Sequence, residues 1–141
     1  DINTLANGRT VLSEVGSKKT EVNISAEQWV SMMKNELEAG SYKVITEARE
    51  SGTIGIFNKD GSAKQELIDD ISHNVKIENV LWEAPKKAQQ VWFIKHFGAN
   101  VNLGNIAHNE VIPLETIRLG LRGDTFFDFL PEEIKDQNGM N

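Results

Sequence analysis

The sequence predicts an α/β fold in which four short strands alternate with four helices. Three pentapeptides share one pattern, an apolar β-branched run that ends in a glutamate and a small apolar residue, and a fourth keeps the length. They are residues 11–15 (VLSEV), 44–48 (VITEA), 80–84 (VLWEA) and 101–105 (VNLGN). Such runs between polar or glycine-containing stretches are typical of buried parallel strands. Strands that alternate with helices indicate a parallel sheet with right-handed crossovers.

The first helix is predicted by signals at both of its ends. Ser25 followed by Gln28 forms a capping-box pattern, which opens a helix that runs to about Ala39. Gly40 stands where a left-handed residue would end it.

Similar signals predict the other three helices. Ser62 and Gln65 repeat the capping pattern, and Pro85 opens a helix that Gly98 closes. The last helix is expected over residues 111–121. Its apolar face is expected to carry Leu114, Ile117 and Leu121.

The strand ends distinguish two architectures that share this order, an open flavodoxin-like sheet and part of a (βα)8 TIM barrel. Glu14, Glu47 and Glu83 stand at equivalent places, and neighbouring strands of a barrel direct such groups into one mouth at their carboxyl ends. Four units are half of eight, and a whole barrel takes about 250 residues. We therefore expect residues 1–131 to form half of a (βα)8 barrel and residues 132–141 to form a polar C-terminal tail.

Composition restricts the setting and the partners. The 141 residues carry a formal charge of −6, contain 39% hydrophobic residues and lack cysteine, which excludes disulfides, zinc–thiolate sites and cysteine nucleophiles. No apolar run is long enough for a membrane span, and no signal peptide is visible after Asp1, which stands where an initiator methionine would be expected. We expect a soluble cytoplasmic protein that binds neither membrane nor nucleic acid.

Three carboxylates at one mouth favour a site for a hard cation. Oxygen ligands suit Mg²⁺, so Glu14, Glu47 and Glu83 are candidate metal ligands. They could instead divide acid and base roles between them. The structural alternative is that each glutamate pairs with a neighbouring lysine or arginine.

The loops that follow the strands supply groups for an anion. Lys18 could act as an electrostatic clamp or a general acid, or could be a solvated lysine. Arg49 and Glu50 lie in a long loop that could act as a lid; Arg49 suits a carboxylate or phosphate, or an ion pair with Glu47 or Glu50. Gly104 allows a ligand close to the backbone, so this loop is the expected phosphate cradle.

Five longer segments resemble the phosphosulfolactate synthase family. They are residues 12–18, 43–52, 83–85, 97–106 and 114–125, in the order of that family. The resemblance implies strands five to eight of a (βα)8 barrel and a carbon–sulfur lyase. Such an enzyme adds sulfite to phosphoenolpyruvate with Mg²⁺ as cofactor and yields (R)-phosphosulfolactate on a route to coenzyme M or related sulfonates.

The resemblance also implies roles for individual residues. Lys18, Glu14 and Glu47 are the expected catalytic residues, and Glu14, Glu47 and Glu83 the expected metal ligands. The residues expected to bind the anionic substrates are Arg49, Glu50, Asn102, Gly104, Asn105 and Arg122.

Two other functions remain open at this point. The family also resembles plant heat-stress-associated proteins, which implies a non-catalytic role, and a different barrel enzyme acting on a small phosphorylated substrate is the other alternative. Half a barrel leaves two open sheet edges, so we expect this chain to form a homo-oligomer or to pair with a missing N-terminal half. Activity of the 141 residues alone is not expected.

Overall fold

The computed structural model describes residues 2–17, 23–137 and 139 of the chain. The strands of the sheet are β1 (Leu12–Val15), β2 (Lys43–Thr46), β3 (Val80–Glu83) and β4 (Leu103–Gly104). The α-helices are α1 (Ile2–Ala6), α2 (Ala26–Glu38), α3 (Gln65–Asn74), α4 (Lys87–Phe97), α5 (Val111–Arg118) and α6 (Glu132–Gln137). Single 3₁₀ turns, η1 (Ile77–Asn79) and η2 (His108–Glu110), precede β3 and α5.

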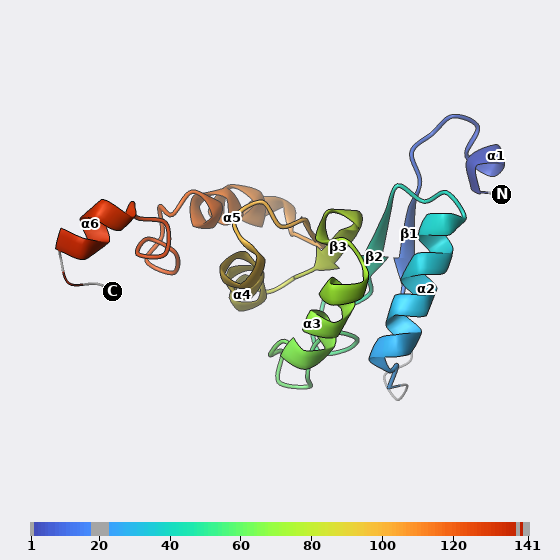
Figure 1. Cartoon of the computed structure of the whole chain (residues 1–141), viewed down its shortest axis with the longest axis horizontal. Helices are drawn as coiled ribbons and strands as arrows, with labels where there is room; N and C mark the ends of the chain where they lie inside the picture. Colours follow the sequence, from blue (N-terminus) through green and yellow to red (C-terminus); the bar gives the residue numbers. More distant parts are fainter. Residues whose placement is uncertain (1, 18–22, 138, 140–141) are drawn as a thin grey trace.

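The strands form one parallel sheet in chain order, β1-β2-β3-β4, and α2 to α5 each follow one strand (Figure 1). This arrangement confirms the predicted succession of four βα units. It is consistent with part of a (βα)8 barrel, although the four strands do not themselves close into one.

Only one face of the sheet is buried. Val44, Thr46, Val80 and Trp82 alternate along β2 and β3, and all four are fully buried in the core that the helices share. The residues between them, on the other face, are partly exposed; they include Lys43, Ile45 and Leu81. Since successive side chains of a strand point to opposite faces, the helices cover one side of the sheet and leave the other side open.

The ends of α2 confirm the signals in the sequence. The Ser25 hydroxyl accepts a hydrogen bond from the Gln28 N–H at 3.2 Å, and the Gln28 side chain accepts one from the Ser25 N–H at 2.9 Å. At the other end Gly40 has φ +113°, and the N–H of Ser41 donates to the Glu36 carbonyl. This pair of features is a Schellman motif, which satisfies the last carbonyls of the helix.

Two predicted helix ends are wrong. Ser62 does not cap α3, because its hydroxyl and its N–H both donate to the Asp60 carboxylate within the preceding loop, and the helix begins at Gln65. The last helix ends at Arg118 and leaves Leu121 69% exposed. Gly120 at φ +71° ends it in a second Schellman motif, in which the N–H of Leu121 donates to the Thr116 carbonyl.

The predicted polar tail contains α6, which has no buried residue. Among the described helices, none combines the length and the apolar character that crossing a bilayer requires.

Candidate active site

The three predicted glutamates lie on one face of the sheet but at two levels. Glu83 pairs with Gly104, and Thr46 pairs with Trp82, so Glu47 is level with Glu83. Glu14 pairs instead with Ile45, two residues before Glu47. The three pentapeptides that carry glutamate as their fourth residue are expected to align at their strand ends. That alignment holds for β2 and β3, whereas β1 is shifted by two residues. A shift of two preserves the face, since side chains alternate with a period of two.

A hollow of about 560 Å³ opens at the carboxyl ends of the strands, and we call it the carboxylate hollow. Six of its lining residues are predicted site residues, which the structure therefore brings together from β1, β3 and the loops after β2 and β4. Its lining residues are Glu14, Glu47, Arg49, Glu50, Ser51, Glu83 and Asn105. Four carboxylates face one guanidinium in this set, so the described lining suits a cation better than an anion.

Glu83 is fastened to the neighbouring strand. Its Oε2 atom accepts a hydrogen bond from the N–H of Ala48 at 2.7 Å, and its own N–H donates to the Thr46 hydroxyl at 3.2 Å. Ala48 is fully buried, so this carboxylate is the hydrogen-bond acceptor for a backbone N–H that water does not reach. The arrangement fixes the orientation of the Glu83 carboxylate at the edge of the hollow.

Glu47 is 7% exposed and rests on a glycine and an indole ring. A Cβ atom at Gly16 would lie 2.9 Å from the Glu47 Cβ and 2.9 Å from the Trp29 ring, and Gly16 has φ +127°. Both facts require glycine here, because a side chain at residue 16 would displace Glu47 or Trp29. Sequence analysis did not identify Gly16 or Trp29 as part of the site, and only the place of Gly16 directly after the strand pattern hinted at it.

Two lining residues have left-handed backbones without being glycine. Arg49 has φ +54° and Asn105 has φ +55°, and Asn7 is the other such residue in the described part of the chain. Asparagine tolerates this conformation, but for arginine it costs roughly 1 kcal/mol or more. Backbone strain of this kind is concentrated at functional sites.

The long loop after β2 is anchored, which differs from the lid that its length suggested. Ile56 and Phe57 within it are buried, and the Phe57 ring packs edge-on against Phe93 at a centroid distance of 6.2 Å. Its backbone pairs with itself between Phe57 and Ala63. The residues that line the hollow are therefore carried by a packed segment.

The structure does not bring Asn102, Gly104 or Arg122 to the lining. The Asn102 amide donates to the carbonyls of Glu78 and Val80, at the amino end of β3. Gly104 is level with Glu83, but a Cβ atom there would lie 2.1 Å from Leu81, so the Leu81 side chain fills the space beside it.

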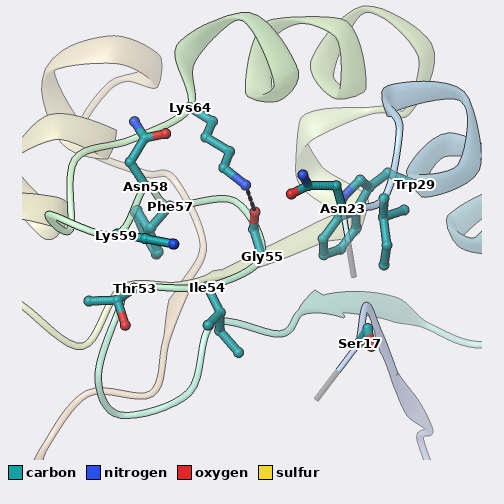
Figure 2. Close-up of a pocket in the computed structure, with 11 residues that line it drawn as sticks. Ser17, Asn23, Trp29, Thr53, Ile54, Gly55, Phe57, Asn58, Lys59 and Lys64 are labelled. Carbon is teal, nitrogen blue, oxygen red and sulfur yellow. Dashed lines mark hydrogen bonds between the residues drawn. The ribbon is translucent and has the colours of Figure 1, made fainter. Parts of the chain in front are cut away.

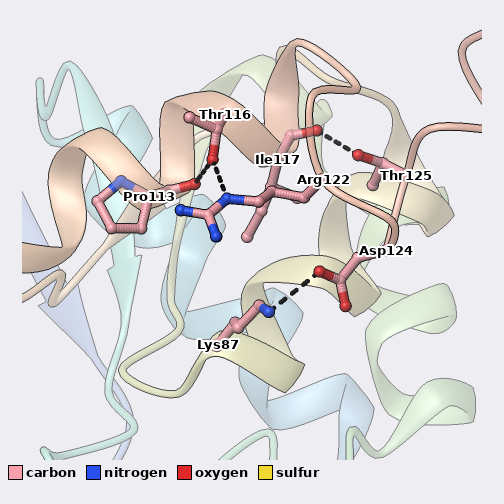
Figure 3. Close-up of polar contacts among 7 residues, drawn as sticks. All are labelled: Lys87, Pro113, Thr116, Ile117, Arg122, Asp124 and Thr125. Carbon is pink, nitrogen blue, oxygen red and sulfur yellow. Dashed lines mark hydrogen bonds and ion pairs between the residues drawn. The ribbon is translucent and has the colours of Figure 1, made fainter.

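Arg122 follows α5 and contacts that helix, and it is not among the lining residues of the hollow. Arg118, at the end of α5, donates to the carbonyl of Val101, which precedes β4. The end of α5 therefore lies near the amino end of β4. The Arg122 guanidinium donates to the Thr116 hydroxyl at 2.9 Å (Figure 3).

Lys18, the predicted catalytic lysine, lies outside the described residues. A second hollow of about 230 Å³ lies between Ser17, the start of α2 and the loop after β2 (Figure 2). Lys64 and Lys59 reach into it, and the Lys64 ammonium donates to the Gly55 carbonyl at 2.9 Å. Trp29 lines this hollow, and its ring also lies against Gly16, the glycine on which the Glu47 side chain rests.

The donor chemistry of the carboxylate hollow fits Mg²⁺. Mg²⁺ is held by one or two carboxylates together with water and substrate oxygens rather than by an all-protein cage. Glu47 and Glu83 are level and line the same hollow. Among the described residues, no three histidine, aspartate or glutamate side chains lie close enough to form a complete metal cluster, so all three glutamates do not converge on one point.

Comparison with known proteins shows the family of the chain. The profile of the (2R)-phospho-3-sulfolactate synthase (ComA) family matches residues 2–124. The chain belongs to this family. It is 51% identical over 120 residues to the phosphosulfolactate synthase of Bacillus subtilis and 49% identical over 123 residues to that of Methanocaldococcus jannaschii. A third synthase, from Methanothermobacter thermautotrophicus, is 44% identical over 121 residues.

These alignments cover 83–85% of this chain but only 47–49% of the three synthases. The chain thus spans about half the length of the curated synthases it matches. Every residue that lines the carboxylate hollow falls within the part that matches the synthase family.

Proposed function

We propose that the carboxylate hollow is where sulfite adds to phosphoenolpyruvate, giving (R)-phosphosulfolactate, a carbon–sulfur bond-forming lyase reaction. The observation that carries this proposal is that Glu47, Glu83 and Arg49 line one hollow within the part of the chain that matches the synthase family. The reaction needs both a means to hold anions and a means to stabilise a developing negative charge, and this set contains residues suited to each.

The reaction balances without an oxidant. The sulfur lone pair of sulfite attacks the methylene carbon of phosphoenolpyruvate and forms the carbon–sulfur bond. The π electrons of the double bond move toward the carboxylate, which becomes an aci-carboxylate, and a proton then adds to the carbon that carries the phosphate. No bond to phosphate breaks.

The residues divide these tasks by charge. Arg49 binds an anionic group, preferably sulfite, through its paired N–H groups. Asn105 and the backbone beside Gly104 bind the phosphate, and Lys18 stabilises the aci-carboxylate or delivers the proton. Glu50 and Ser51, which line the hollow next to Arg49, set its polar surroundings.

Glu47 and Glu83 would hold the metal, and Glu14, below them on the same face, would accept hydrogen bonds from the waters bound to it. Bound Mg²⁺ supplies positive charge that neutralises the substrate carboxylate as it gains electrons. Without a cation, four carboxylates in one hollow would repel both anionic substrates.

The four βα units, we further propose, form half of a (βα)8 barrel with the open face of the sheet turned inward. The partial exposure of Ile45 and Leu81 on that face, and the length of the related synthases, motivate this proposal. The open face and the β1 and β4 edges would then pack against four further units, or against a second copy of the chain. Light scattering of the 141 residues should show association, and a cooperative monomer would contradict it. We place the protein in the cytoplasm, in agreement with its lack of cysteine.

A sulfite-consumption assay on the full-length protein tests the proposed function. Sulfite should disappear only when both phosphoenolpyruvate and Mg²⁺ are present, and chelation by EDTA should stop it. A folded protein that consumes no sulfite under these conditions would contradict the proposal and favour a non-catalytic role.

A further inference from the structure

A single buried amide on α4 reaches the loop that carries Arg49. Gln89 stands in the first turn of this helix and is 3% exposed. Its Nε2 atom donates to the Gly52 carbonyl at 2.8 Å and to the Gly61 carbonyl at 2.9 Å. Two points of the loop that are nine residues apart in sequence are thus held by one side chain.

The loop and the amide fit each other closely. A Cβ atom at Gly52 would lie 2.6 Å from the Gln89 Nε2 atom and 2.7 Å from its Oε1 atom, and Gly52 has φ +59°. Only glycine at residue 52 leaves the amide room to reach both carbonyls. Both N–H groups of the amide are used, and its oxygen accepts the N–H of Lys86 at 3.2 Å. Both donors of the Gln89 amide are therefore committed to the loop, and its oxygen is committed to the start of α4.

Gly52 connects the clamp to the site. Its N–H donates to the Arg49 carbonyl at 3.1 Å, which closes a turn over residues 49–52. Arg49, Glu50 and Ser51 in this turn line the carboxylate hollow. Holding Gly52 in place thus holds the turn, and the turn keeps Arg49 in a left-handed conformation that it would not adopt by itself.

We propose that Gln89 is a positioning residue for the carboxylate hollow: by clamping Gly52 and Gly61 it holds the 49–52 turn so that the Arg49 guanidinium meets the anionic substrate. This inference rests on the proposed function for its kinetic consequence, but the clamp itself is measurable without turnover. The competing explanation is purely structural, since the Gln89 oxygen also caps α4.

One substitution separates the two explanations. Gln89→Glu keeps an oxygen acceptor for the Lys86 N–H, and a carboxylate at a helix amino end is favourable. The same change removes both donors to the loop and sets a carboxylate against two carbonyls. Gln90→Glu is the matched control, because Gln90 is also buried on α4 and donates its amide to a backbone carbonyl outside the loop, that of Ala84.

The experiment compares these variants in the full-length protein. In Gln89→Glu, hydrogen exchange of the amides in residues 49–55 should be about tenfold or more faster than in Gln90→Glu, and the KM for sulfite should rise about tenfold while kcat changes less. Equal exchange in the two variants would overturn the clamp, whether or not the protein turns over sulfite. A wild-type protein that shows no turnover would contradict the proposed function alone.

A double-substitution cycle with Arg49→Gln tests whether Gln89 acts through Arg49. If it does, Gln89→Glu adds little further loss of kcat/KM in the Arg49→Gln background. Fully additive losses would mean that Gln89 acts by general stability, and would overturn the positioning role.

Discussion

The Glu83 carboxylate accepts a hydrogen bond from the N–H of Ala48 at 2.7 Å, which ties the end of β3 to the residue beyond β2. This contact gives Glu83 a structural task as well as its proposed role toward the metal. The two tasks can be separated, because a glutamine oxygen can accept the same hydrogen bond but cannot supply the charge.

Glu83→Gln should therefore lower the rate of sulfite turnover by about 100-fold or more, while the melting temperature changes little. Glu83→Ala should lose activity and also destabilise the fold by about 1–3 kcal/mol, because the buried Ala48 N–H loses its partner. Turnover assays and thermal melts of both variants provide the comparison. Equal destabilisation by the two changes would show that the charge, and not the hydrogen bond, holds the strands together.

Arg49→Gly should uncouple stability from activity. Glycine adopts φ +54° without strain, so the variant should be as stable as the wild type or more stable by up to about 1 kcal/mol. Sulfite binding should be lost together with the guanidinium. Arg49→Ala is the control, since it loses the same group but keeps the strained backbone. A gain in stability in the alanine variant as large as that in the glycine variant would argue against strain at residue 49.

Gly16→Ala should disturb the packing of Glu47 and Trp29 against residue 16. The added methyl would lie 2.9 Å from the Glu47 Cβ and from the Trp29 ring, at a φ that alanine disfavours. We expect a loss of about 1–3 kcal/mol in unfolding free energy and a marked fall in turnover. Gly123→Ala, where a Cβ would meet nothing within 4 Å, should leave both almost unchanged. Denaturant unfolding of the two variants checks this, and equal effects would contradict the packing argument.

The segment after α5 should respond to acid through one ion pair. Lys87 lies 3.1 Å from Asp124 (Figure 3), and its hydrogen bond holds the pKa of the Asp124 carboxyl below the ordinary value of 3.8. A carboxyl whose pKa is lower in the folded state stabilises the fold above the unfolded-state pKa and loses that contribution as the pH falls through the folded-state pKa.

Lys87→Met should therefore lower the melting temperature near neutral pH, and the difference from the wild type should vanish toward about pH 2, where Asp124 is protonated in both. Lys76→Met, at an exposed lysine, controls for the change in net charge. A difference between Lys87→Met and the wild type that stays constant across the pH range would contradict the role of Asp124.

Local pattern predicted the strands and the glutamates that line the carboxylate hollow, because each strand's composition and the glutamate at its end are short-range properties. The pentapeptides of β2, β3 and β4 align in the sheet as they do in the sequence, whereas β1 is shifted by two residues. Such stagger is set by the tilt of the strands in the sheet, which leaves no mark within one strand.

The contacts of Asn102 and Gln89 could not be predicted, because they too depend on how the elements are arranged in the fold. Asn102 lies within a segment that resembles the synthases, but its amide joins β4 to the amino end of β3. In the sequence Gln89 has the pattern of an ordinary polar helix residue, and its role depends on a contact with Gly52, which lies 37 residues earlier. Contacts over such separations follow from the assembled fold and cannot be read from spacing.

The central claim is that the carboxylate hollow forms a carbon–sulfur bond between sulfite and phosphoenolpyruvate. The most direct measurement follows phosphoenolpyruvate, labelled with ¹³C at its methylene carbon, by NMR in D₂O with sulfite, Mg²⁺ and the full-length protein. We predict that the vinyl signal is replaced by that of a saturated, sulfonate-bearing carbon, that deuterium appears on the adjacent carbon, and that Glu47→Gln prevents both. An unchanged vinyl signal with folded protein, or release of inorganic phosphate without a new carbon–sulfur bond, would contradict the claim.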